Sequence, residues 1–230
     1  MLALSLLAVL ALAGWRWHQS STPTSITQVH LTGARGPAPV DLVVLLDTSG
    51  SFQAYRAIRE RALHDALTWT TRNLRPADTV TIISFDGAAA TLLPTTPIRG
   101  ITGGAHVNTF PKPTDGTRIQ PALQQALDHL QAVASSTGPS TTARVRSLIA
   151  VTDTLVTDAD PHPIASLTNH LGIATMTLVL PNGLGTSPAW ESAFSYEQVV
   201  TADSSNPDSI ALAFAAAAAH ATGQTLQLVR

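Results

Sequence analysis

The sequence predicts an α/β domain with a mainly parallel central sheet and helices on both faces. Residues 41–47 and 147–152 form continuous apolar runs, which are typical of strands buried on both faces. Residues 79–85 and 173–180 are two further apolar strands, and segments with a helical spacing of apolar residues separate the four. Strands that alternate with helices form parallel sheets through right-handed crossovers, which place helices on both faces.

The first half of the domain is predicted as strand, helix, strand and edge strand. After the first strand, small or apolar side chains recur at helical spacing over residues 52–74. Residues 75–78 end this helix, and the strand at 79–85 follows. A short strand at 88–93 is expected to lie antiparallel at an edge of the sheet, joined through the Asp86-Gly87 turn.

Residues 94–116 are rich in glycine and proline and are predicted to form a long irregular loop. Loops of this length in compact domains are commonly functional. Apolar side chains then recur from Ile119 to Val133 with the spacing of a strongly amphipathic helix, before the strand at 147–152.

The last part of the chain continues the alternation of strands and helices. The expected elements are a helix at 163–171 that ends at Gly172, a strand at 173–180, a short strand near 197–200 and a helix at 207–221. Gly223 stands where a C-cap glycine belongs.

Residues 1–17 are expected to be a membrane anchor or a signal-like segment. Residues 1–13 are almost wholly apolar, and Trp15-Arg16-Trp17 suits a membrane interface. The apolar run is shorter than the about 17–25 residues that cross a bilayer. A cleaved signal is one alternative, because Ala11-Leu12-Ala13 is a small-x-small triplet of the kind that signal peptidase cuts. A natural start further upstream is the other.

The anchor sets the expected organisation of the chain. It predicts a membrane-associated protein with a single-pass anchor; Arg16 argues for a cytoplasmic domain, but the extracytoplasmic side is favoured. Residues 18–39 are rich in Ser, Thr, Pro and Gly and are predicted as a linker that holds, at most, a short strand at 26–31. The folded domain is expected to occupy residues 40–230.

The composition excludes several classes of protein. Charged residues make up 12% of the chain and the formal net charge is −2, so the basic surface of a nucleic-acid-binding protein is missing. Hydrophobic residues make up 44%, which is enough to bury a core and argues against disorder. The chain has no cysteine, which excludes disulfide scaffolds and thiolate metal sites.

Three polar groups follow predicted strands or begin a helix, at the edge of the sheet where open α/β domains bind ligands. The groups are Asp47, Ser49 and Ser51 after the first strand, Thr117 at the start of the amphipathic helix, and Asp153 after a later strand. Carboxylates and hydroxyls are the hard oxygen ligands that Mg²⁺ prefers. Two carboxylates balance the charge of a divalent ion, and a remaining coordination position can accept an acidic group from a partner.

At these positions the chain resembles the von Willebrand factor type A (vWA) domain and its metal-ion-dependent adhesion site (MIDAS). The MIDAS pattern is D-x-S-x-S, then a separate Thr, then a separate Asp; the matching residues are Asp47, Ser49, Ser51, Thr117 and Asp153. The resemblance covers about residues 40–222 and implies a Rossmann-like, three-layer fold. It implies that those five residues hold Mg²⁺, with Mn²⁺ or Ca²⁺ as alternatives. It also implies a protein-binding module, not an enzyme, whose metal takes a carboxylate from a protein partner.

Four residues near the pattern need a separate interpretation. Thr154 stands where relatives commonly have glycine after the last Asp, and Asp115 adds an acid that is expected to tune metal affinity. Asp158 and Asp160 are predicted to be solvated loop acids.

Other interpretations stay open. The group after the first strand (Asp47, Ser49 and Ser51) could merely cap the following helix. Thr117 is expected to serve both as a helix N-cap and as a ligand. A metal-dependent phosphoester hydrolase is the alternative function, because Mg²⁺ and carboxylates also bind phosphates. A third function is that of a tethered subunit of a larger membrane complex, which differs from an adhesion module in its partner and its anchor.

Overall fold

The computed structural model describes residues 22–101, 107–137 and 143–229. Its centre is a six-stranded sheet in the order β4-β3-β2-β5-β6-β7. The strands are β2 (Val40–Asp47), β3 (Thr79–Phe85), β4 (Ala89–Pro97), β5 (Val145–Val151), β6 (Ile173–Pro181) and β7 (Gln198–Ala202). β4 is antiparallel to β3, and the other neighbouring pairs are parallel. The predicted mainly parallel sheet is confirmed.

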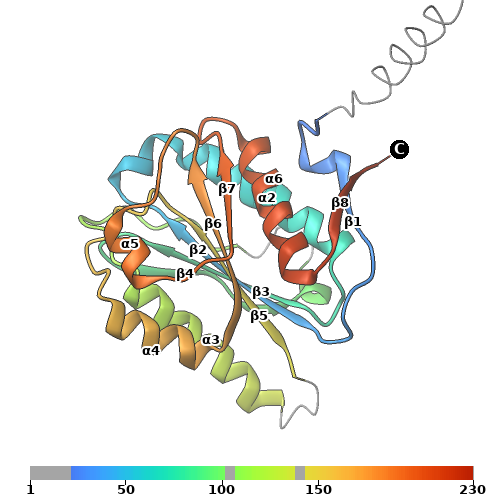
Figure 1. The fold of residues 1–230 in the computed structure, drawn as a ribbon, viewed down its shortest axis with the longest axis horizontal. Helices are drawn as coiled ribbons and strands as arrows, with labels where there is room; N and C mark the ends of the chain where they lie inside the picture. Colours follow the sequence, from blue (N-terminus) through green and yellow to red (C-terminus); the bar gives the residue numbers. More distant parts are fainter. Residues whose placement is uncertain (1–21, 102–106, 138–142, 230) are drawn as a thin grey trace, which may run out of the picture.

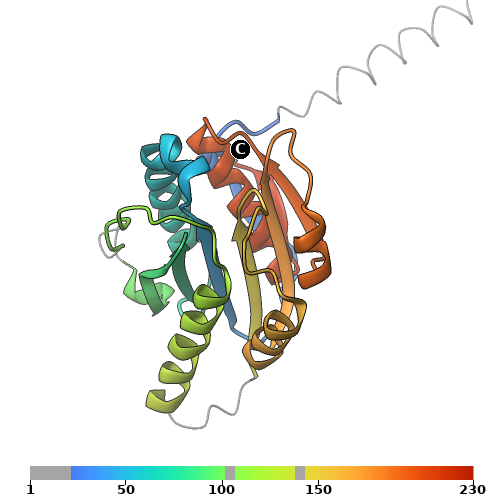
Figure 2. The same cartoon turned by 90° about the vertical axis from the view of Figure 1, so that its left-hand side faces the viewer.

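Helices cover both faces of the sheet, as Figures 1 and 2 show. The pairs that pack together are α2 (Arg56–Asn73) with α6 (Pro207–Thr222) on one face, and α3 (Gln120–Thr137) with α4 (Pro161–Leu171) on the other. Successive residues of a strand point to opposite faces. In β2, Leu42 and Val44 therefore join the core under α2 and α6, whereas Val43 and Leu45 join the core under α3 and α4. The continuous apolar runs serve two cores, and the three-layer α/β fold is confirmed.

The helix ends follow local sequence signals. α4 ends at Gly172 and α6 at Gly223, both glycines with a left-handed backbone (φ +64° and +68°), as the sequence predicts. The short helix α5 (Pro188–Ala193) was not predicted, although Ser187 caps it and Pro188 occupies its first turn. It places Trp190 in the core beneath α3 and α4.

The edge strand β4 is longer than the predicted 88–93. It continues to Pro97, and the 3-10 helix η3 (Ile98–Gly100) follows, so the long irregular loop begins later than expected. Proline lacks the amide that a central strand needs, but β4 pairs with β3 alone and tolerates Pro94.

A two-stranded sheet joins the two ends of the described chain. β1 (Val29–Thr32) pairs antiparallel with β8 (Thr225–Leu228), and Figure 1 shows the pair beside α2 and α6. Residues 18–39 were predicted as a linker with at most a short strand, yet the buried Ile26 and Val29 belong to the core. The partner strand of β1 lies at the opposite end of the sequence, so no local pattern could reveal the pairing.

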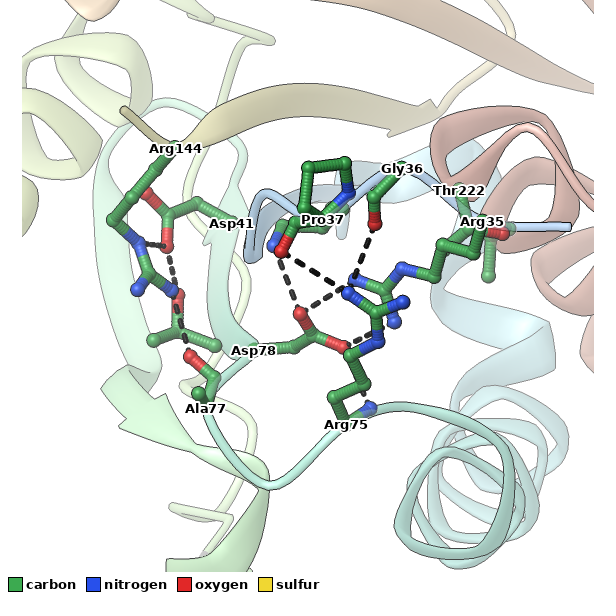
Figure 3. Close-up of polar contacts among 12 residues, drawn as sticks. Arg35, Gly36, Pro37, Asp41, Arg75, Ala77, Asp78, Arg144 and Thr222 are labelled. Carbon is green, nitrogen blue, oxygen red and sulfur yellow. Dashed lines mark hydrogen bonds and ion pairs between the residues drawn. The ribbon is translucent and has the colours of Figure 1, made fainter. Parts of the chain in front are cut away.

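A buried aspartate at the amino end of the sheet fixes the chain segment that leads into β2 (Figure 3). Asp78 is fully buried, and its two carboxylate oxygens accept hydrogen bonds from the guanidinium of Arg35 at 2.6 and 2.7 Å. The same carboxylate accepts hydrogen bonds from the backbone amides of Val40 and Arg75, at 2.8 and 2.7 Å. The chain that enters the domain is therefore held by a charged pair as well as by β1.

The predicted membrane segment at residues 1–17 lies outside the described residues. Among the helices of residues 22–101, 107–137 and 143–229, none combines the length and the apolar character of a membrane span.

Candidate metal centre

Asp47 lies at the carboxyl end of β2 and is fully buried. Its Oδ1 accepts hydrogen bonds from the amide of Ser49 at 3.0 Å and from the hydroxyl of Ser49 at 2.6 Å. Its Oδ2 accepts a 2.7 Å hydrogen bond from the hydroxyl of Thr152, directly after β5. Because β2 and β5 are parallel neighbours, their carboxyl ends meet at this carboxylate.

The hydroxyl of Ser49 is oriented by its contact with Asp47. A serine hydroxyl has one proton to donate, and Asp47 accepts it, which fixes the orientation of Ser49 Oγ. Ser51 lies in the 3-10 helix η2 (Gly50–Tyr55), and its side chain lies outside the described part of the structure. The first element of the predicted pattern thus presents one oriented hydroxyl next to one buried carboxylate.

Thr117 reaches the site through a loop that is tied to the end of β3. The buried Asp86 accepts hydrogen bonds from the amide and the hydroxyl of Thr114. Where this loop crosses the turn after β3, a Cβ added to Gly87 would lie 1.9 Å from the carbonyl oxygen of Asp115, so only glycine allows the close approach. Thr117 itself is 8% exposed.

Asp153 follows β5 and is 8% exposed. Its Oδ1 accepts a 3.0 Å hydrogen bond from the amide of Leu155. Thr154, between them, has φ +66°, in the left-handed region that β-branched residues rarely adopt. The amide of Ser187 donates to Thr154 Oγ1 at 2.8 Å, and the hydroxyl of Ser187 donates to the Thr154 carbonyl at 2.6 Å. The threonine thus keeps the backbone expected of a glycine and adds a side-chain contact to the start of α5.

One open cavity of about 450 Å³ lies over these residues. Its lining includes Ser49, Thr117 and Asp153 together with the exposed Asp115 and Leu155. Asp47 lies behind Ser49, so the structure brings four of the five predicted ligands to one place. Across the described residues, no cluster of three or more His, Asp or Glu side chains could hold a metal, so a site here also needs hydroxyls. The oxygen donors present fit a hard divalent cation by their chemistry.

The two acids that were predicted to be solvated both cap helices; Asp160 is exposed as predicted, whereas Asp158 is half-buried. Asp158 accepts hydrogen bonds from the amides of Ile119 and Gln120 at the start of α3, at 2.8 and 3.0 Å. Asp160 is the N-cap of α4. Asp158 therefore satisfies the helix start that the sequence assigned to Thr117, and it comes from a distant loop that propensity cannot foresee.

A buried cation that was not predicted from the sequence contacts the backbone of Asp47. Arg59 of α2 is 5% exposed, and its Nη1 donates a hydrogen bond to the backbone carbonyl of Asp47. Burial lowers the pKa of Arg59 to about 10, although the charges of Asp47 and Asp153 raise it. Burial also raises the pKa of Asp47 above its ordinary 3.8, while hydrogen bonds from Ser49 lower it. At neutral pH Arg59 stays charged, so the site combines two carboxylates with one fixed cation.

The left-handed backbone of Thr154 gives a stability prediction. Thr154→Ala is expected to lower the free energy of unfolding by about 1–3 kcal/mol, because the amide of Ser187 loses its partner. Thr154→Gly loses the same bond but relieves the backbone, so it is expected to be about 1 kcal/mol more stable than the alanine variant. Urea unfolding of both variants measures the difference.

Thr168 in α4 provides the control, because it lies within a helix. There the glycine variant is expected to be less stable than the alanine variant by about 1 kcal/mol. The same order at both positions would contradict the interpretation of Thr154.

Comparison with known proteins places the domain in a family. Residues 42–155 match the family model described as the von Willebrand factor type A domain. No curated protein matches the sequence.

Several solved structures share the fold. Proximal thread matrix protein 1 from the mussel byssus, solved with a zinc-occupied MIDAS motif, is 16% identical with a TM-score of 0.59, over 80% of this chain and 48% of that chain. The pilus adhesin SpaC from Lactobacillus rhamnosus GG is 13% identical with a TM-score of 0.59, over 89% and 34%. The manganese-loaded TRAP protein of Plasmodium vivax is 15% identical with a TM-score of 0.54, over 87% and 80%.

These similarities establish a shared architecture. The chain spans about half the length of the thread matrix protein and about a third of the adhesin. None of the three similar proteins is named as an enzyme.

Proposed function

This chain contains a von Willebrand factor type A domain, and on that premise we propose that it is a metal-dependent protein-binding module. Domains of this family are metal-dependent adhesion and protein-interaction modules. The proposed ligands of a divalent cation are Asp47, Ser49, Ser51, Thr117 and Asp153, acting directly or through water. The observation that carries the proposal is the hydroxyl of Ser49, which a buried carboxylate orients beside a cavity shared with Thr117 and Asp153.

Mg²⁺ is the proposed cation, with Mn²⁺ or Ca²⁺ as alternatives. Carboxylate and hydroxyl oxygens suit these hard ions, and the zinc and manganese of two similar proteins support a divalent ion. A coordination position that the domain leaves open would take a carboxylate from a protein partner. A nucleic-acid partner is not proposed, because the chain has a net charge of −2.

Hydrolysis of phosphoesters is not proposed. The residues that line the cavity include no histidine or lysine to serve as a base or to hold a phosphate. Serine and threonine hydroxyls, two carboxylates and an open cavity suit binding of a partner's side chain.

The proposal places the domain beside a membrane. The apolar residues 1–13 and the Trp15-Arg16-Trp17 group support a tether at residues 1–17. The extracytoplasmic side is proposed for the domain because short apolar leaders commonly direct export, although Arg16 alone argues for the cytoplasmic side. The buried Ile26 and Arg35 then hold the chain between tether and domain against the folded core.

A chelator-controlled capture experiment tests the proposal. The full chain is expected to retain a protein from membrane extracts in Mg²⁺ and to release it in EDTA. Leu155 is 65% exposed in the cavity lining, so the neutral polar substitution Leu155→Asn is expected to weaken capture while the charge of the site, and with it the Mg²⁺ affinity, stays unchanged. Calorimetric titration with Mg²⁺ measures that affinity.

Val199→Asn provides the matched control, because Val199 is 45% exposed in the edge strand β7, outside the cavity lining. It is expected to leave capture intact. A wild-type chain that binds no Mg²⁺, or that captures its partner equally well in EDTA, would contradict the proposed function.

A further inference from the structure

Arg59 is a buried cation without a side-chain ion pair of its own among the described contacts. The guanidinium carbon lies 3.5 Å from the centroid of the Phe52 ring, and Nη1 donates to the backbone carbonyl of Asp47. Within the described part of the chain, its Nε has no hydrogen-bond partner. Buried arginines are normally neutralised by a carboxylate in direct contact. Arg59 instead stacks on an aromatic ring beneath the loop that carries Ser49.

The charge of Arg59 is felt by both acids of the proposed site. Asp47 and Asp153 each attract its guanidinium. Without a metal, these three groups sum to one negative charge. With a divalent cation they sum to one positive charge, whereas the two carboxylates alone would leave the bound cation neutralised.

We infer that Arg59 tunes the metal site: it weakens the hold on the cation and leaves the loaded site positive, so that it attracts a partner's carboxylate. The inference rests on the proposed function, since it needs a metal held by Asp47 and Asp153. Arg59 acts through its charge and through the backbone of Asp47, and is a positioning residue rather than a ligand. Repulsion between like charges in a site of low dielectric is strong enough to alter affinity for an ion.

Arg59→Gln and Arg59→Lys test the charge of Arg59. Both side chains are shorter than arginine, but glutamine removes the charge whereas lysine keeps it. In calorimetric titration of the full chain with Mg²⁺, the glutamine variant is expected to bind about tenfold more tightly than wild type. The lysine variant is expected to stay within about twofold of wild type, because its charge is conserved. A substitution that merely damaged the site would lower its Mg²⁺ affinity. An increase in affinity would therefore show the effect of removing the charge.

A second readout uses acetate as the carboxylate. Bound Mn²⁺ broadens the proton signal of acetate that reaches the metal, and at equal Mn²⁺ occupancy Arg59→Gln is expected to broaden it less than wild type. Arg59→Met serves as a second neutral variant if the glutamine variant does not fold. A folded neutral variant with unchanged or weaker Mg²⁺ binding would overturn the inference alone. Absence of Mg²⁺ binding by wild type would overturn the proposed function together with it.

Discussion

Replacing Asp78 with alanine is expected to lower the free energy of unfolding by about 3–5 kcal/mol. The carboxylate of Asp78 is fully buried and makes both hydrogen bonds to the guanidinium of Arg35, whose side chain is 6% exposed. Alanine leaves that cation buried without its counter-charge. It also leaves the amides of Val40 and Arg75 without their acceptor. Urea unfolding followed by the fluorescence of the buried Trp69 and Trp190 measures the loss.

An exposed ion pair supplies the control for this prediction. Arg61 and Asp65 lie one helical turn apart in α2, 3.8 Å from each other, with 70% and 32% of their side chains exposed. Such pairs contribute about 0–1 kcal/mol, so Asp65→Ala is expected to change stability little. If Asp78→Ala were no more destabilising than Asp65→Ala, the Arg35 pair would not hold the entering chain.

Most of the fold could be predicted because the buried strands carry their own signal. Continuous apolar runs occur where a strand serves two cores, and β2 shows this with Val43 and Val44 on opposite sides. A short strand was expected at 26–31, but its pairing with β8 depends on a distant segment of the chain. The edge strand was expected at 88–93, and its extension to Pro97 includes prolines that are typical of a loop.

The oxygen-bearing side chains of the candidate site could be predicted from the sequence, but the contacts that hold them in place could not. The D-x-S-x-S pattern identifies Asp47 and Ser49, and the structure places them in contact. The role of Asp158 depends on a loop reaching α3 from another part of the chain. Arg59 did leave a signal, because it precedes Ala62 by three residues on the buried face of α2. A charged side chain on the apolar face of a helix needs a polar partner, and for Arg59 that partner is the backbone carbonyl of Asp47.

Asp153→Asn is expected to reduce Mg²⁺ affinity by about 100-fold or more, because the affinity of oxygen sites depends on the number of charged ligands. The amide oxygen can still accept the hydrogen bond from Leu155, so the loop is expected to keep its conformation. At a Mg²⁺ concentration of about 100 times Kd, the wild-type domain gains about 2.7 kcal/mol, or roughly 5–10 °C in melting temperature. Thermal unfolding with and without Mg²⁺ measures this shift, which the variant is expected to lose.

The shift is also expected to depend on pH. Burial raises the pKa of Asp47 above 3.8, so just above pH 3.8 the folded, metal-free domain holds a proton that the unfolded chain has lost. The unfolded state then binds fewer protons, and the contribution of Asp47 to stability falls as the pH rises through the raised pKa. A bound cation offsets the ionised carboxylate, so the stabilisation by Mg²⁺ is expected to grow as the pH rises through that window.

Asp160→Asn is the matched control for charge, because Asp160 lies seven positions further along the same loop and caps α4. Asparagine is an equally good cap, so the variant loses one negative charge without losing the helix start. It is expected to keep the Mg²⁺ shift and its pH dependence, since Asp160 does not line the cavity. Equal losses in both variants would mean that Mg²⁺ responds to the overall charge of the loop, and an unchanged shift in Asp153→Asn would place the cation elsewhere.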